Sequence, residues 1–394
     1  MGRWCRVALA LFALLAAPAR SAEPIRIGVS GPFTGGSSPM GLSMRDGIRV
    51  AAAEINAAGG LLGRPVLLVE RDDGARNERG AQLAQELIGR EKVVAAIGIV
   101  NTGVALASQR FYQEARVPMI TAVATGSIVT RQFLPPQHPD NFIFRMSAND
   151  TIQAAMIVEE AVERRRFRKL AILADSTNYG QLGREDLERA LEKKGVRPVA
   201  VDKFNIRDID MTRQLMRARE AGAEALLLYG IGPELAQIAN GAAKLGWSVP
   251  IIGGWPLSMS NFIDSAGPNG EGARMPQTFI QEPTTPRRRA FIEAWQKLAR
   301  AERMPSPSAA AQGYDGMLLL AAAIRQAGTT HGSRVREALE NLKDKVEGVI
   351  TTYERPFSRG DHEAIDSPAQ VTLGEVRGGR VVRAYEETRK KTAK

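Results

Sequence analysis

The sequence predicts an α/β protein made of two units, each a doubly wound parallel sheet with helices on both faces. Short, nearly continuous apolar segments alternate with amphipathic segments along most of the chain. Apolar strands of this kind are buried on both faces, which is typical of parallel sheets covered by helices. The alternation runs through two rounds, separated by the Pro-rich segment 134–140. Residues 23–394 also exceed the roughly 250–300 residues that one hydrophobic core serves, so we expect two domains.

The first round begins with a strand and a helix that a Gly/Ser/Pro-rich loop separates. In that helix Met44, Ile48 and Ile55 recur at helical spacing on one face. The pair Gly59-Gly60 then ends the helix. Strands are expected at 25–31, 65–73, 93–100 and 117–124, and helices at 42–60, 78–89 and 107–115.

The second round repeats this pattern, and a tail with a different character follows it. Strands are expected at 169–175, 199–204, 224–230 and 249–254, and helices at 151–165, 183–195, 210–222 and 233–246. The tail has helices at 287–302, 309–328 and 333–344, then short strands at 348–353, 369–376 and 379–385. Because the tail is too small for a core of its own, we expect it to pack on the earlier units.

The first 22 residues resemble a secretory signal peptide. A basic start is followed by the apolar run VALALFALLAA, which is too short to span a bilayer. We place the start of the mature chain between Arg20 and Glu23. The single cysteine, Cys5, lies inside this segment, so the mature chain is expected to have neither a disulfide nor a thiolate metal site. The expected location is the periplasm.

The charge of the chain gives little support to nucleic-acid binding. The formal net charge of +10 includes Arg3, Arg6 and Arg20 of the expected signal peptide. The densest basic run, 164–169, has one aromatic residue and continues a predicted helix. The remaining positive charge is spread among many acidic residues, as on a solvated surface.

An enzyme is not favoured by the available side chains. His138, His331 and His362 are scattered and have no partner at the spacing of metal ligands. The nucleophile elbow, the phosphate-binding loop and the dinucleotide fingerprint are absent. The pair Asp72-Asp73 ends a strand and is best explained as a turn and helix-capping pair. We therefore expect no metal, no cofactor and no catalytic residue.

The loops at the carboxyl ends of the strands are the expected ligand site, because ligands of wound α/β sheets collect there. These loops are rich in Gly, Ser and Thr and contain no lysine or histidine. A carboxylate above Thr102-Gly103 could accept hydrogen bonds from free helix N–H groups and from the hydroxyls of Thr102 and Thr125. The alternative is that each threonine only caps its own helix.

Several motifs together resemble the periplasmic leucine/isoleucine/valine-binding proteins of ABC importers. They run in order along nearly the whole mature chain: IRIGVSGPFTG, EINAAGGLLGRPVLLVERDD, VPMITAVAT, ADSTNYGQLG and AQGYD. The resemblance implies two lobes joined by three crossovers that close on a ligand like a hinge. Lobe 1 would comprise 23–145 and 276–349, and lobe 2 would comprise 146–275 and 350–394. The crossovers would fall near FIFRMSAND, ARMPQT and GVITTYERP.

The resemblance also implies roles for individual residues. The carboxylate of an amino acid would bind the loops at Thr102-Gly103 and at Val123 to Thr125. Tyr179 would close over the ligand from the opposite lobe, with Trp255 on the same side. Ser37 and Ser38 would form the rim of the site.

Two departures from the family pattern affect the expected ligand. The positions of the family's disulfide match Ala75 and Asn101, and neither is a cysteine. The acidic residue that receives the ligand's ammonium in leucine binders matches Trp255 or a neighbour, and 251–261 contains no carboxylate. Because a buried ammonium without an anion is costly, three explanations stay open. Trp255 offers a cation–π face, an acid outside this loop replaces the missing one, or the ligand has no ammonium.

The expected function is capture of a small hydrophobic or branched-chain amino acid, or a related carboxylate, for an ABC permease in the inner membrane. Aromatic acids, short-chain acids and amides are alternative ligands. Two other hypotheses are a receptor that serves a sensor kinase and an exported hydrolase on the same fold. The protein is expected to be a monomer that binds a small molecule.

Overall fold

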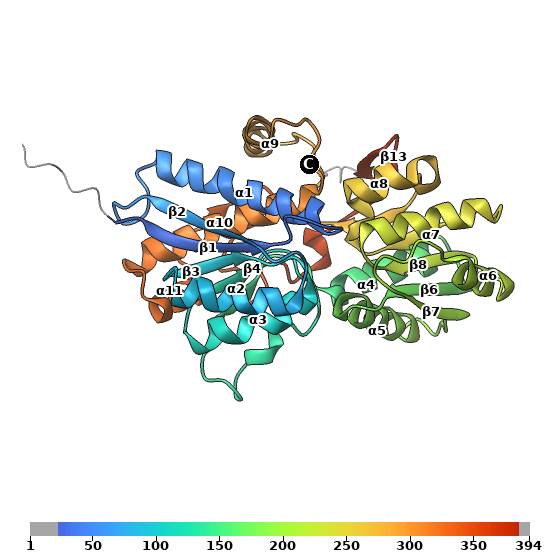
Figure 1. The fold of residues 1–394 in the computed structure, drawn as a ribbon, viewed down its shortest axis with the longest axis horizontal. Coiled ribbons are helices and arrows are strands. Elements are labelled where there is room, and N and C mark those ends of the chain that lie inside the picture. The colour runs from blue at the N-terminus through green and yellow to red at the C-terminus, as the bar shows by residue number, and fades with distance from the viewer. Residues whose placement is uncertain (1–22, 386–394) are drawn as a thin grey trace, which may run out of the picture.

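The computed structural model describes residues 23–385, and the expected signal peptide lies outside this range. Two lobes lie side by side along the longest axis of the molecule (Figure 1). We call lobe 1 the part built on the five-stranded sheet and lobe 2 the part built on the seven-stranded sheet. This confirms the predicted fold class. No helix within 23–385 has the length and apolar character needed to cross a membrane.

Lobe 1 contains a sheet in which all five strands are parallel. Their spatial order is β2 (Val66–Asp72), β1 (Ile25–Gly31), β3 (Ala95–Gly98), β4 (Met119–Thr121) and β5 (Ile143–Arg145). Neighbouring residues of β3 pack on opposite faces: Ile97 joins the core under α1 and α10, and Ala96 joins the core under α2 and α3. The helices of this lobe are α1 (Ser38–Ala57), α2 (Asn77–Gly89), α3 (Thr102–Glu114), α9 (Pro286–Ala299), α10 (Pro307–Ala327) and α11 (Gly332–Glu340).

Helices α1 and α10 pack with their backbones in contact, although the chain of lobe 2 separates them. A Cβ atom added at Gly47 would lie 2.0 Å from the Ala310 carbonyl oxygen, and one at Gly313 would lie 2.3 Å from the Met44 carbonyl oxygen. Glycine is therefore required at both positions for this close approach. The late helices thus complete lobe 1, as the sequence predicted for the tail.

Lobe 2 contains a mixed sheet in which β13 alone runs opposite to the other strands, so that it is antiparallel to both of its neighbours, β10 and β14. The order is β14 (Arg380–Arg383), β13 (Thr372–Arg377), β10 (Arg274–Gln277), β9 (Ile251–Gly253), β8 (Ala225–Tyr229), β6 (Leu170–Asp175) and β7 (Ala200–Phe204). Its helices are α4 (Asp150–Val158), α5 (Asn178–Glu192), α6 (Thr212–Glu220), α7 (Gly232–Lys244) and α8 (Ser260–Ala266). Helix α4 continues as a π-helix, η2 (Glu159–Arg164).

The sequence prediction missed three short elements because each has too few residues for a clear period. They are β5, β10 and α8, and the sequence assigned β5 and β10 to crossover segments. The expected strand 348–353 is instead part of a hairpin of β11 (Val346–Glu347) and β12 (Thr352–Tyr353). Short 3₁₀ turns lie at η1 (Arg131–Phe133), η3 (Trp255–Ser258), η4 (Gly267–Gly270) and η5 (Pro368–Gln370). The lobe boundaries stay a prediction.

The segment from β11 to residue 363 contacts lobe 1 at two places. Residue 363 forms a bridge with Arg145 at the end of β5. The buried carboxylate of Asp315 in α10 accepts hydrogen bonds from Val349 N (2.7 Å), Ile350 N (3.0 Å) and the Tyr353 hydroxyl (2.9 Å). Asp315 therefore fixes the β11–β12 hairpin to α10.

We expect Asp315→Ala to lower the free energy of unfolding by about 2–4 kcal/mol, because three donors around a buried acceptor lose their partner. Urea unfolding followed by circular dichroism measures this loss. Asp344→Ala, which removes an exposed aspartate next to the same hairpin, is the control and should change stability by less than about 0.5 kcal/mol. Equal effects of the two substitutions would contradict the role assigned to Asp315.

Candidate functional site

The carboxyl ends of the parallel strands in the two lobes face each other across a closed cleft. The β1–α1 loop touches lobe 2 at Gly36, whose carbonyl oxygen accepts a hydrogen bond from Asn261 Nδ2 at 2.9 Å. A Cβ atom at Gly36 would lie 3.4 Å from Pro233 of α7. At the β3–α3 loop, a Cβ atom at Gly103 would lie 2.6 Å from Asn77 Oδ1 and 2.8 Å from Asn178 Oδ1. Residues of both lobes therefore meet at the predicted site.

The two loops predicted to hold a carboxylate lie next to each other. Thr102 is buried, and its Oγ1 accepts a hydrogen bond from Gly126 N at 3.2 Å. Thr102 is the first residue of α3, and the N-cap residue Asn101 makes no side-chain cap bond. The Thr102 hydroxyl is therefore not a helix cap, so the alternative of simple capping is wrong for this residue. The Thr102 hydroxyl can therefore donate its own hydrogen bond to a ligand.

Val123 and Thr125 belong to the loop that follows β4. Both are buried, and Val123 N donates to the Ile99 carbonyl oxygen at 3.3 Å. The Thr125 carbonyl oxygen accepts from Asp150 N at 2.9 Å. The Thr125 side chain also lies close to the Asp150 carboxyl group and acts to lower its pKa. Thr125 therefore connects the lobe 1 loop to the first residue of α4.

The far side of the site is aromatic. The rings of Tyr179 and Tyr229 lie 5.1 Å apart between centroids, and both are buried. The Tyr179 hydroxyl has no hydrogen-bond partner among the described residues. It lies 2.5 Å from the position that a Cβ atom would take at Gly254. Trp255 is buried beside this glycine, and its backbone N donates to Gln153 Oε1 at 3.2 Å. Sequence reasoning identified Tyr179 and Trp255 but missed Tyr229.

Asp150 is a buried acid outside the Trp255 loop that the sequence did not single out. Its side chain is fully buried, and Oδ1 accepts a hydrogen bond from the Tyr229 hydroxyl at 3.1 Å. Oδ2 is buried and has no partner within the described chain. Burial raises the pKa of Asp150 to about 7, while the hydrogen bonds from Thr125 and Tyr229 act in the opposite direction. No sequence pattern pointed to this residue, because it lies in a segment that resembled only a crossover and the start of a helix.

The predicted rim residues occupy the start of α1. Ser37 is buried, and its Oγ accepts a hydrogen bond from Asn101 Nδ2 at 3.0 Å. Ser38 is the first residue of α1 and is half-buried. Ser37 therefore contacts the α3 loop directly.

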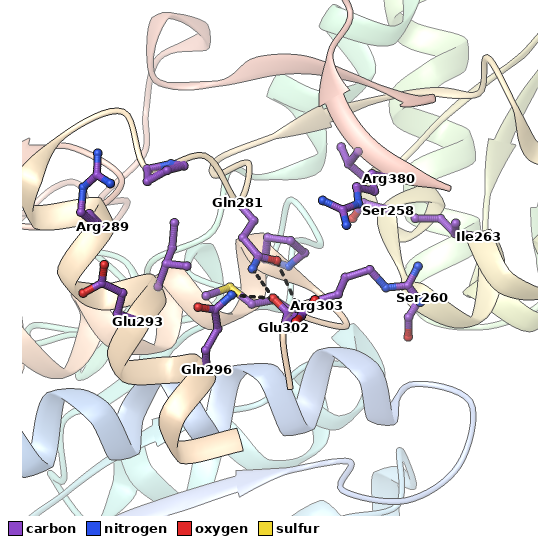
Figure 2. A pocket seen from close by; sticks show the side chains of 15 residues that line it. Ser258, Ser260, Ile263, Gln281, Arg289, Glu293, Gln296, Glu302, Arg303 and Arg380 are labelled. Atoms are coloured by element: carbon purple, nitrogen blue, oxygen red, sulfur yellow. Dashed lines mark hydrogen bonds between the residues drawn. The ribbon is translucent and has the colours of Figure 1, made fainter. Parts of the chain in front are cut away.

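Two cavities of similar size adjoin both lobes, and only one contains predicted site residues. The first, of about 480 Å³, is lined by Thr102, Gly103 and Tyr179 together with the starts of α2 and α5. The second, of about 520 Å³, lies between α9, the 300–307 loop, α8 and β14. Figure 2 shows Arg289, Glu293 and Gln296 on one side of this second cavity and Ser260, Ile263 and Arg380 on the other. None of the strand-end residues predicted to bind ligand contributes to it.

The acidic pair Asp72-Asp73 forms a turn, as the sequence indicated. Asp72 Oδ1 accepts from Phe33 N (2.8 Å) and Gly74 N (2.9 Å), and Asp73 Oδ1 accepts from Ala75 N (2.8 Å). Burial raises the pKa of Asp73 to about 7, and its Oδ2 has no partner among the described residues. The pair therefore shapes the loop beside the first cavity.

Asp73 is expected to make the protein less stable as the pH rises from about 4 to 7. The folded state keeps its proton up to the raised pKa, whereas the unfolded chain releases it near the ordinary value of about 4. Asp73→Asn keeps the acceptor for Ala75 N and removes the free-energy cost of ionising a buried carboxyl group. We expect the variant to be more stable than the wild type by roughly 2–4 kcal/mol at pH 8 and equal to it near pH 4. Urea titrations at both pH values test this, and a difference independent of pH would contradict it.

Comparisons with known proteins identify a family and a set of relatives that the chain resembles. A family model described as periplasmic binding protein matches residues 24–380. The chain is 28% identical over 320 residues to the Leu/Ile/Val-binding protein homolog 3 of Brucella melitensis, covering 81% of this chain and 84% of that protein.

Solved structures show the same architecture. The periplasmic binding protein type 1 of Bordetella pertussis superposes with a TM-score of 0.80 at 25% identity, covering 92% of this chain and 99% of that one. A Rhodopseudomonas palustris solute-binding protein in complex with 4-hydroxybenzoate superposes with a TM-score of 0.78 at 20% identity, covering 92% and 95%. The same fold therefore occurs in a protein that binds an aromatic acid.

Proposed function

Because the chain belongs to the periplasmic binding protein family, we propose that it is the solute-binding component of an ABC importer. It captures a small hydrophobic or branched-chain amino acid, or a related carboxylate, in the cleft between its lobes and delivers it to a permease in the inner membrane. Residues 1–22 direct export to the periplasm, and the mature chain acts as a monomer without a catalytic step. Closure is favoured by a ligand that contacts both lobes, because such a ligand binds the closed state more tightly than the open one.

The observation that carries this proposal is the unpartnered oxygen of Asp150 beside the carboxylate-binding loops. Thr102, Gly103, Val123 and Thr125 hold the ligand's carboxylate at the start of α3, where free N–H groups and the helix dipole favour an anion. Asp150 Oδ2 accepts a hydrogen bond from the ligand's ammonium, which replaces the acid missing from the Trp255 loop. Tyr179, Tyr229 and Trp255 cover the ligand from lobe 2, and Ser37 and Ser38 complete the rim.

A second candidate is an aromatic or short-chain acid without an ammonium group. The aromatic set of Tyr179, Tyr229 and Trp255 supports it, since these side chains bury a large apolar area. With such a ligand, Asp150 stays protonated and donates a hydrogen bond instead of accepting one.

Thermal unfolding with paired ligands tests the proposal. Leucine, valine and phenylalanine are compared with their 2-oxo acids, with benzoates and with simple amides. A ligand at about 100 times its Kd stabilises the folded state by about 2.7 kcal/mol, which raises the melting temperature by several degrees. A shift with amino acids supports the first candidate, and a shift with deaminated acids alone supports the second. No shift with any of these ligands counts against both.

A further inference from the structure

Helix α8 belongs to lobe 2, yet its first two residues are hydrogen-bonded to lobe 1. Ser260 N donates to the Pro305 carbonyl oxygen at 2.9 Å, in the loop that leads into α10. The next residue, Asn261, donates from Nδ2 to the Gly36 carbonyl oxygen at 2.9 Å. Gly36 lies in the loop after β1, and Asn261 lies in the segment after β9, so this bond joins strand ends of opposite lobes across the cleft. Opening of the cleft separates these strand ends and breaks the bond.

The amide of Asn261 is oriented by its own lobe. A Cβ atom at Gly232, the first residue of α7, would lie 2.2 Å from Asn261 Oδ1. The missing side chain of Gly232 therefore makes room for the amide oxygen, which is buried and has no donor among residues 23–385. The NH₂ group is left on the side that faces lobe 1. Asn261 is thus prearranged to bond Gly36 when the lobes close, which reduces the entropy lost on forming the bond.

The other side-chain contact of α8 with lobe 1 is an exposed ion pair. Arg303 donates to both carboxylate oxygens of Asp264, at 2.7 and 2.6 Å. These side chains are 39% and 57% exposed, so water and salt screen the pair and it contributes little. Between α8 and α9 lies the cavity of about 520 Å³ (Figure 2), so these two helices do not pack closely there. The bond of Asn261 involves no net charge, and salt does not screen it.

Helix α8 also connects this bond to the candidate ligand site. It follows the 3₁₀ turn η3, which begins at Trp255, and Met259 alone separates the two elements. Within the turn, Trp255 and Leu257 are buried, and Ser258 Oγ donates to the Trp255 carbonyl oxygen at 2.7 Å. A ligand that packs on Trp255 therefore also fixes the start of α8. Asn261 itself lines neither cavity, so it affects ligand binding through the position of the lobes.

We propose that Asn261 is a positioning residue for ligand capture, which holds the two lobes in the closed state without contacting the ligand. Its bond to Gly36 exists only in the closed state, so it raises the closed fraction of the protein with or without a ligand. A ligand that requires the closed state binds more weakly when that fraction falls. This inference rests on the proposed function and adds a residue that sets how tightly every ligand of the cleft is held.

The affinity of Asn261→Ala for the ligands of the thermal unfolding panel tests this role. Loss of one uncharged hydrogen bond should weaken binding about three- to tenfold. The factor should be the same for every ligand that binds the wild type, because Asn261 does not contact the ligand. Stopped-flow kinetics should show the loss as faster dissociation, with an association rate constant within about twofold of the wild type. An unchanged affinity overturns the proposal, and so do losses that differ between ligands, which would indicate direct contact.

Two further variants make this result specific. Asn269→Ala removes an exposed asparagine whose Nδ2 donates to Asn240 Oδ1 at 2.8 Å within lobe 2, and it should leave every affinity unchanged. Asn261→Asp keeps the shape of the side chain and removes the donor, so at pH 8 it should weaken binding at least as much as Asn261→Ala. It also decides the matter if Asn261→Ala does not fold.

The free protein provides a test that needs no ligand. Because Cys5 lies in the expected signal peptide, nitroxide labels can be attached to the mature chain at Arg79→Cys in α2 and Glu185→Cys in α5, which are both exposed positions. Pulsed electron paramagnetic resonance then measures the distance between the lobes. Asn261→Ala should lower the ratio of short to long distances about three- to tenfold. If no ligand of the panel binds, the proposed function fails, and equal distance distributions in the two proteins then overturn the role of Asn261 as well.

Discussion

Asp150→Asn is expected to weaken binding of an α-amino acid by about 30- to 150-fold, which corresponds to about 2–3 kcal/mol for a lost charge-assisted hydrogen bond. The ligand's ammonium would enter a buried site that no longer holds an anion. The deaminated counterpart of the same ligand should bind the variant at least as tightly as it binds the wild type. Calorimetric titration of both ligands measures the difference.

Asp186→Asn is a matched control, because Asp186 is a buried aspartate of α5 whose charge raises the pKa of Asp150. Removing that charge lowers the pKa of Asp150 and favours its ionised form, so amino-acid affinity should stay the same or rise. An unchanged affinity in Asp150→Asn would contradict the assigned role and leave Asp150 as a structural partner of Tyr229.

The pH dependence of binding gives a separate check on Asp150. The raised pKa of about 7 means that its carboxylate is largely protonated below that pH in the free protein. Only the ionised form pairs with an ammonium, so amino-acid affinity should fall as the pH decreases from 8 to 6. The dependence should disappear in Asp150→Asn. A deaminated ligand should show the opposite trend if it accepts a hydrogen bond from the protonated form.

Arg145→Met is expected to lower the free energy of unfolding by about 3–5 kcal/mol, because it leaves Glu363 without its buried partner. The Arg145 side chain is fully buried. Its Nε and Nη2 donate to Glu363 at 2.6 Å each, and its Nη1 donates to the Gly126 carbonyl oxygen at 2.7 Å. The pair joins the end of β5 to the segment around residue 363. Urea unfolding measures the loss.

Arg116→Met provides the comparison for an exposed ion pair. Arg116 pairs with Asp140 at 2.9 Å, but its side chain is 57% exposed. Such pairs contribute roughly 0–1 kcal/mol, so the loss should be at most that large. The double variant Arg145→Met/Glu363→Gln should recover part of the stability, since it removes the unpaired charge as well. Equal losses for Arg145→Met and Arg116→Met would contradict the argument.

The sequence predicted the long helices and strands well, because the spacing of their apolar residues is clear over many residues. The apolar positions of β6 and β8 and the helical face of α1 define their elements without any help from distant parts of the chain. The strand-end rule also selected Thr102, Thr125 and Tyr179, which the structure places in or beside the cleft. Their roles in binding stay predictions.

What the sequence could not provide depends on contacts between distant segments. Asp150 becomes a candidate only because folding buries it against Thr125 and Tyr229, which lie on different lobes. The unpartnered oxygen of Asn101 likewise depends on the position of Ser37. Strands β5 and β10 exist because neighbouring strands pair with them, and three or four residues carry no detectable period alone.

The close packing of α1 on α10 has a consequence for the order of assembly. Ser306 N donates to Ser43 Oγ across a separation of 263 residues, and Arg274 bonds Glu375 across 101 residues. Contacts so distant in sequence form slowly, because much of the chain must first be brought together.

The order in which the two lobes fold follows from this difference. Lobe 2 is inserted within lobe 1, so its inner strands pair only with segments that are near in sequence. We therefore expect lobe 2 to acquire its β6–β9 nucleus early. Lobe 1 gains a complete core only after α10 has emerged and returned to α1, which leaves an open, incompletely covered sheet during synthesis and export.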